Sequence, residues 1–393
     1  MSKSLLEYYQ ENSFNPVKIP VEDKAAWDLH VAKRLNLYEK HLGIPVSMLR
    51  GMDILEFGSN SGENALVLAS FGAHIDLVEP NEQVHPRLRD LFRKFGLDLE
   101  SERFSLFHGS MAEYPEEHKY DLVLAEGFLF TLPNREEMLK KMGRLLNPGG
   151  IAVTSFHDKY GMLIETLKRF TLHRSCEMMK VGPTKNDACL DIAKQLFEQD
   201  FNAINASRPF KMWWEDVLIN PHISYKNLWT YEDILPLIEE VGCEFKASSP
   251  RWDGVDHFDW YKNVADRSER HGKLMTNWQQ AFPFFINGVG REDSGLTGAR
   301  SIDAVGKLVE RLFTYIEKPD LSANPIDFTL ELRDFFIWMD RNLGWELETF
   351  FHAAYASSGT ALIEAYQNSP CLRSFWGVPY HYFAFSKPLK GDS

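Results

Sequence analysis

Short apolar segments alternate with helical segments over residues 52–157, and this alternation limits the available folds more than any other feature of the chain. We expect strands at 52–58, 73–80, 103–110, 120–127 and 151–157, helices at 63–72, 83–96 and 134–146, and a turn at 147–150. The segment DLVLA is apolar almost throughout, as in strands that are buried on both faces. The alternation predicts βαβ units in a Rossmann-like α/β fold, with a mostly parallel sheet covered by helices on both faces.

Beyond residue 159 the pattern becomes mostly helical, with two later strands expected at 243–250 and 379–388. These two strands would complete a seven-stranded sheet, and the long helical stretches between them would be insertions. We therefore predict an N-terminal helical cap at 1–50, the Rossmann-like core at 51–159, a helical lid insertion at 160–229, a continuation of the core at 230–261, a helical insertion at 262–375, and the final core strand and tail at 376–393.

Composition excludes several classes of function. The chain has 393 residues and a formal net charge of -13, which disfavours nucleic acid as a partner because phosphate binding needs clustered lysine and arginine. No segment approaches the ~18 consecutive apolar residues of a membrane span, and the first residues lack the apolar stretch of a signal peptide. The four cysteines are scattered without a CxxC pair, which indicates a reduced, cytoplasmic protein with no metal site.

The segment EFGSNSG, Glu56–Gly62, lies between the first expected strand and the first helix. In open parallel sheets ligands bind outside the carboxyl ends of the strands, where glycines such as Gly58 and Gly62 let the backbone approach a ligand closely. A dinucleotide fingerprint needs G-x-G-x-x-G, and Asn60 occupies its middle position, so NAD(P) and FAD are disfavoured. Glu79 ends the second strand, where it either accepts the two hydroxyls of a ribose or lies on the surface.

The segments LEFGSNSG, LVEP, HGSMAEY, YDLVLAEGFLFTL and LLNPGGIAVTSF follow one another in this order. In this order they resemble the class I S-adenosylmethionine-dependent methyltransferases. The resemblance covers about residues 51–157, and more loosely 230–250 and 379–388. It implies an enzyme that uses S-adenosylmethionine as its cofactor and transfers the methyl group by in-line displacement.

The family pattern implies a role for individual residues at the carboxyl ends of the strands. It places the methionine part against Glu56, Gly58, Ser59, Asn60 and Gly62, the ribose on Glu79, the adenine against Pro80, Asn81, Ser110 and Met111, and the sulfonium and acceptor near Glu126 and Gly127. The chain departs from the pattern at Asn60, where many members have glycine, and at Ser110, where many have aspartate.

Acceptors that carry a removable proton need a general base. His157 lies at the end of the fifth strand, near the edge where the acceptor is expected, although a histidine in an ordinary strand-to-helix connection is the alternative. Glu126, His222 and His257 are further candidates for a catalytic role. If the acceptor is already nucleophilic, positioning alone suffices.

The acceptor is expected to be a small molecule, such as a sugar, a lipid-linked compound or a secondary metabolite. Two alternatives stay open: methylation of protein or nucleic acid, and a non-catalytic S-adenosylmethionine-binding module. AEGF stands where an asparagine-proline-proline type motif would mark nucleic-acid amino methylation. The aromatic residues between 213 and 261 either wall the acceptor pocket or form core. The apolar helical face within 328–355 serves either a homodimer or a helical subdomain.

Overall fold

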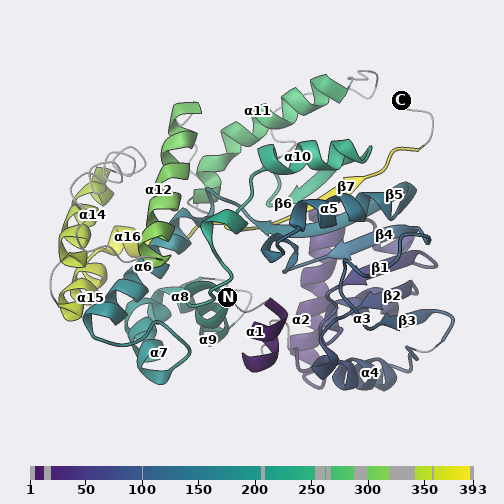
Figure 1. The fold of residues 1–393 in the computed structure, drawn as a ribbon, viewed down its shortest axis with the longest axis horizontal. Helices are drawn as coiled ribbons and strands as arrows, with labels where there is room; N and C mark the ends of the chain where they lie inside the picture. Colours follow the sequence, from purple (N-terminus) through teal and green to yellow (C-terminus); the bar gives the residue numbers. More distant parts are fainter. Residues whose placement is uncertain are drawn as a thin grey trace. The chain divides into compact units, whose positions relative to one another are not determined.

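The protein is described by a computed structural model over residues 5–12, 19–99, 101–204, 209–252, 262, 267–286, 299–317, 341–355 and 358–389 (Figure 1). The chain divides into two compact units. Unit 1 comprises residues 1–156, 231–265 and 381–393, and unit 2 comprises residues 157–230 and 266–380.

Unit 1 is built on a seven-stranded sheet in the order β3-β2-β1-β4-β5-β7-β6. Its strands are β1 (Asp53–Phe57), β2 (His74–Val78), β3 (Phe104–Phe107), β4 (Tyr120–Ala125), β5 (Leu146–His157), β6 (Glu244–Ser249) and β7 (Tyr380–Ser386). The pairs β1–β2, β1–β4, β2–β3 and β4–β5 are parallel, and β6–β7 is antiparallel. The predicted Rossmann-like, seven-stranded and mostly parallel sheet is therefore confirmed.

The expected turn at 147–150 was wrong, because β5 begins at Leu146 and runs through this segment. Tyr120 of β4 pairs with Leu146, whereas Leu122 pairs with Ile151, so the intervening residues bulge out of the ladder. Main-chain bonds to Lys387, the residue after β7, hold the bulge, since Gly149 N donates to Lys387 O at 2.7 Å and Lys387 N donates to Gly150 O at 3.0 Å. Proline and glycine bend the chain here without ending the strand.

Helices of unit 1 cover the sheet (Figure 1). They are α2 (Lys24–Leu35) followed by a π-helical turn (Asn36–His41), α3 (Glu63–Ser70), α4 (His85–Lys94), α5 (Arg135–Arg144) and α10 (Tyr231–Glu240), and a short helix, α1 (Leu5–Asn12), precedes them in the chain. One apolar cluster joins the π-helical turn, α3 and α4 to residues from β1, β2 and β4. Ile54, Leu122 and Leu124 are each at most 1% exposed in this cluster, so the strands that carry the site are rigidly packed from this face.

Unit 2 is helical over the residues that the structure describes. Its helices are α6 (Met162–Met178), α7 (Asp187–Ala193), α8 (Gln199–Ala203), α9 (Phe210–Trp213), α11 (Arg267–Ile286), α12 (Ala299–Glu317), α14 (Arg341–Ala354), α15 (Gly359–Gln367) and α16 (Pro370–Ser374). The helix α6 is buried along most of its length and packs against α12, α15 and α7. Unit 2 therefore has a core of its own, centred on α6.

Several sequence predictions fall on parts of the chain with limited description. His257 lies outside the described residues, as does much of the apolar face expected within 328–355. Trp213, Trp214, Trp229 and Trp252 are buried, as core aromatic residues are. Among the described helices, none is both long and apolar enough to cross a membrane.

Candidate functional site

The turn that follows β1 has an unusual backbone. Gly58 and Gly62 have φ values of +68° and +88°, and Asn60 lies in the left-handed region with φ 49°. Gly58 N donates to Val78 O of β2 at 2.8 Å, and Gly62 N donates to Ser59 O at 2.9 Å. Glycine carries this conformation without steric cost, and asparagine is among the few other residues that tolerate it. The sequence EFGSNSG thus folds into a tight turn between β1 and α3.

Glu79 lies directly after β2 and reaches this turn. Its Oε2 accepts a hydrogen bond from Asn60 N at 2.7 Å, and its Oε1 accepts one from Asn81 N at 2.8 Å. Burial raises the pKa of the Glu79 carboxyl above its usual range, although the two main-chain bonds oppose this shift. Each carboxylate oxygen keeps a second lone pair, so Glu79 can still accept hydrogen bonds from two hydroxyls.

A buried charge cluster lies where β1 and β4 end. Arg34 from α2 donates to Glu126 through both terminal nitrogens, at 2.7 and 2.6 Å, and its side chain is 7% exposed. Tyr38, one turn further along the helix, contacts Arg34 through its hydroxyl and lies 3.2 Å from Glu126 Oε1. A bidentate pair of this kind fixes both side chains. The helix α2 is thereby tied to the end of β4.

Glu56 is the second acid of this cluster and has no counter-ion of its own among the described residues. It is 5% exposed on β1. Burial raises its pKa to about 8, and the charge of Glu126 adds to the rise while Arg34 opposes it. The cluster therefore holds more potential negative charge than Arg34 can neutralise.

Three buried oxygens of this site lack a hydrogen-bond partner within the described part of the chain. They are Glu56 Oε2, Ser59 Oγ and Asn60 Oδ1. An unpaired buried polar atom costs about 1–3 kcal/mol. Three of them within five residues of sequence indicate that a polar ligand supplies the missing partners.

The two glycines of the turn differ in what surrounds them. A Cβ at Gly62 would lie 3.3 Å from Leu88 and from Phe92, so this glycine lets α3 pack closely against α4. A Cβ at Gly58 would lie 2.6 Å from the ring of Phe128, in the segment that follows β4. Phe128 therefore covers the glycine-rich turn, a contact that the sequence reasoning missed.

The segment after β3 and the end of β4 complete the predicted set in unit 1. Ser110 donates through both its main-chain nitrogen and its hydroxyl to Glu113 Oε2, at 2.7 Å each. Met111 is 5% exposed, and Pro80 is half-buried beside Glu79. Gly127, the residue after Glu126, has φ +87° and donates from its nitrogen to Ser155 Oγ at 2.8 Å.

The described histidine candidates belong to unit 2. His157 is 8% exposed, lies 5.5 Å from the ring of Tyr380, and accepts a hydrogen bond from Trp229 N through its carbonyl. His222 is half-buried, and burial lowers its pKa.

Arg34 and Tyr38 were not predicted as site residues. The spacing i, i+4 on one helix face beside the apolar positions Val31 and Leu35 is the signal that could have found them. An arginine next to an apolar stripe often lays its aliphatic part on that stripe while its guanidinium reaches solvent. The spacing alone therefore does not predict a buried ion pair.

Comparisons with known proteins agree with this fold. A family model described as "Methyltransferase domain" matches residues 41–245, which is more than half of the chain. Among solved structures, a S-adenosylmethionine-dependent methyltransferase from Clostridium acetobutylicum ATCC 824 is 16% identical, with a TM-score of 0.25 over 28% of this chain and 44% of that one.

Two further structures align over longer stretches. PKMT2 from Rickettsia typhi, in complex with AdoHcy, is 15% identical, with a TM-score of 0.44 over 64% of this chain and 50% of that one. The [4+2]-cyclase SpnF is 13% identical, with a TM-score of 0.35 over 93% of this chain and 82% of that one. Since these three TM-scores are low, the assignment rests on the family model. The chain belongs to this methyltransferase-domain family, in agreement with the predicted resemblance to the S-adenosylmethionine-dependent methyltransferases.

Proposed function

We propose that the site at the ends of β1, β2 and β4 binds S-adenosylmethionine and that the enzyme transfers its methyl group to a small-molecule acceptor. The observation that supports this proposal most is the group of three unpaired buried oxygens, Glu56 Oε2, Ser59 Oγ and Asn60 Oδ1. They lie where the family pattern puts the methionine part of the donor. An ammonium group there would supply both hydrogen-bond donors and positive charge.

The charges of the site fit this ligand. Glu56, Glu79 and Glu126 are all shielded from water, and Arg34 forms an ion pair with Glu126 alone among these three acids. The donor carries two positive groups, an ammonium and a sulfonium, and one carboxylate. When bound, S-adenosylmethionine supplies a methyl carbon that is already activated for in-line displacement by its sulfonium. The acidic excess of the site would therefore be reduced by the ligand.

Individual residues then take distinct roles. Glu79 would accept the ribose hydroxyls with its remaining lone pairs, while Asn60 N and Asn81 N hold its carboxylate in place. Glu56 and Ser59 would hold the methionine part. Glu126 would act through its position and charge, because both of its oxygens already accept hydrogen bonds from Arg34.

The net charge of -13 disfavours nucleic acid, so a sugar, a lipid-linked compound or a secondary metabolite is proposed ahead of a macromolecule. Removal of the acceptor's proton is proposed for His157, His222 or His257, and a homodimer through the later helical insertion remains a further proposal.

The donor site is tested by calorimetry with S-adenosylhomocysteine. Replacing Glu79 with Ala removes both acceptors for the ribose, and we expect the affinity to fall by at least about tenfold, since hydrogen bonds to charged groups contribute about 1.5–3 kcal/mol each. The matched control is Glu82→Ala, three residues further on and exposed. Unchanged affinity in the Glu79 variant would overturn the assignment.

Turnover is tested separately with isotopically labelled donor and fractionated metabolite extracts. We expect a labelled product of low molecular mass with the wild-type enzyme, and about tenfold less of it with Glu79→Ala at donor concentrations below the Kd. Label found only in protein or nucleic acid would favour a macromolecular acceptor. Donor binding without any labelled product would favour a binding module without catalysis.

A further inference from the structure

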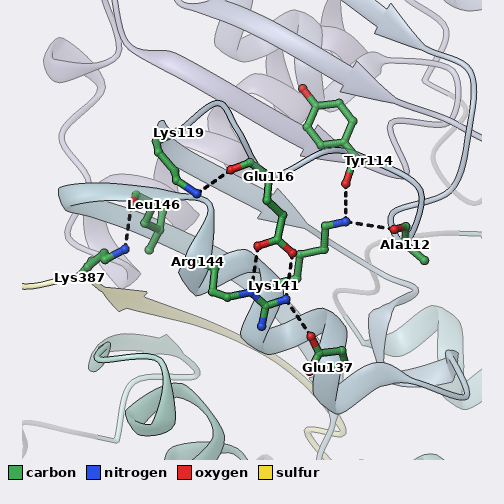
Figure 2. A network of polar contacts seen from close by, with 9 residues as sticks. All are labelled: Ala112, Tyr114, Glu116, Lys119, Glu137, Lys141, Arg144, Leu146 and Lys387. Carbon is green, nitrogen blue, oxygen red and sulfur yellow. Dashed lines mark hydrogen bonds and ion pairs between the residues drawn. The ribbon is translucent and has the colours of Figure 1, made fainter.

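Lys141 is a buried lysine of α5 that touches the segment following β3 (Figure 2). It is 4% exposed, and its ammonium donates to Ala112 O at 3.1 Å and to Tyr114 O. Burial lowers the pKa of Lys141, so the residue is costly to bury. The hydrogen bonds to the two carbonyls offset part of this cost. They also fix the main chain of residues 112–114.

The same helix holds the next part of this segment. Arg144 donates to both oxygens of Glu116, at 2.9 Å each, and also to Glu137 at 2.7 Å. Lys119 Nζ donates to Glu116 O at 2.6 Å. Figure 2 shows the Lys141 and Arg144 side chains reaching the segment at successive points along α5. The segment is thus bound to the helix at two places.

The sheet holds the segment from the other side, through the side chain of Tyr114. Its ring makes edge contacts with the rings of Phe57 and Phe107, at the ends of β1 and β3, and the ring centroids lie 5.7 and 5.2 Å apart, respectively. Its hydroxyl lies 2.5 Å from that of Tyr120, which donates to Asp76 Oδ2 at 2.6 Å. Tyr114 is therefore fixed by the sheet through its ring and by Lys141 through its carbonyl.

Ser110 is connected to this fixed point by a closed turn. Its two bonds to Glu113 are returned by Glu113 N, which donates to Ser110 O at 3.1 Å. These three bonds close residues 110–113 into one turn. A displacement at Ala112 or Tyr114 would therefore displace Ser110.

We propose that Lys141 is a positioning residue for recognition of the adenine, acting through the main chain of Ala112 and Tyr114 on Ser110 and Met111. This inference rests on the proposed donor site, in which those two residues lie at the adenine edge. Lys141 would not touch the ligand itself. Its role predicts a loss of discrimination at the adenine amino group, with little effect on the ribose and methionine parts.

The test compares two ligands by calorimetry: S-adenosylhomocysteine and its purine counterpart, which lacks the 6-amino group. In the wild type we expect the adenine form to bind about tenfold more tightly, as one additional hydrogen bond allows. In Lys141→Met we expect the adenine form to weaken by about tenfold and the purine form by less than twofold. The ratio between the two ligands would then approach one.

Lys140→Met is the matched control, because it removes the same charge from the adjacent position, where Lys140 pairs with Glu240 at the surface. We expect it to keep the wild-type ratio, and Lys141→Arg, which can donate to both carbonyls, to retain most of the preference. Should Lys141→Met fail to fold by circular dichroism, Lys141→Gln is measured in the same way.

Each outcome separates the two proposals. A wild type that binds neither ligand overturns the donor site itself. If the wild type binds both ligands, the donor site stands. The positioning role is then overturned if Lys141→Met leaves both affinities unchanged or weakens both equally.

Discussion

Glu56 is expected to make donor binding depend on pH. In the free protein its pKa is about 8, against an ordinary value of 4.5, so at pH 7 the carboxyl is about nine-tenths protonated. A bound ammonium group favours the ionised form and lowers the pKa. Binding at pH 7 should therefore release about 0.9 proton from this group. The affinity should rise about tenfold per pH unit between about pH 5 and pH 8, and then level off.

The assay is titration calorimetry with S-adenosylmethionine in two buffers of different ionisation enthalpy, for the wild type and Glu56→Gln. Glutamine has the shape of the protonated carboxyl and does not titrate. Protons that the ligand's own amino group exchanges are released in both proteins, so subtracting the protons released by Glu56→Gln from those released by the wild type leaves the contribution of Glu56. At pH 7 ionising the carboxyl costs the wild type about 1.4 kcal/mol. The reasoning is refuted if the two proteins release equal numbers of protons, or if their affinities follow pH with the same slope.

Three further predictions concern stability, each measured by urea denaturation. Arg34→Met should lower the free energy of unfolding by about 3–5 kcal/mol, because it leaves Glu126 buried without its cation. Adding Glu126→Leu to this variant should recover most of the loss. A loss below about 1 kcal/mol in Arg34→Met alone would contradict the pairing. Gly62→Ala should lower the free energy of unfolding more than Gly51→Ala. Both glycines have positive φ, but nothing lies within 4 Å of a Cβ at Gly51. Equal losses in the two variants would exclude a packing role for Gly62. Burial lowers the pKa of His173 from 6.5 to about 4, so its contribution to stability is present above pH 6.5 and lost as the pH falls towards 4. Between pH 6.5 and pH 4 the free energy of unfolding of the wild type should fall by about 3 kcal/mol more than that of His173→Gln. Equal pH dependence of the two free energies would contradict this expectation.

The sheet was predictable because its signals are local. Each strand of the first half is a short apolar run that ends at glycine or at a polar residue, and the structure places β1, β2 and β4 within those runs. The bulge at residues 147–150 was not predictable. Its strand character depends on hydrogen bonds with Lys387, which is remote in the sequence, whereas proline and glycine locally indicate a turn.

The candidate site divides in the same way. The turn around Asn60 and the acid at Glu79 could be named from the sequence because both follow strands whose carboxyl ends meet at one edge of the sheet. The pairing of Arg34 with Glu126 joins residues 92 positions apart and depends on how α2 packs. The Ser110–Glu113 turn was within reach, since its S-x-x-E spacing is a local signature of reciprocal capping.

The cost of burying charge connects the fold of unit 1 with its proposed chemistry. Unit 1 keeps Glu56, Glu79 and Glu126 largely out of water, yet provides a direct ion pair only for Glu126 among the described residues. A protein selected for stability alone would gain by replacing such groups with apolar side chains. Their presence beside a turn with unpaired oxygens is explained if a cationic ligand supplies the missing charge. The free protein is then less stable than its fold allows, and ligand binding should recover that difference.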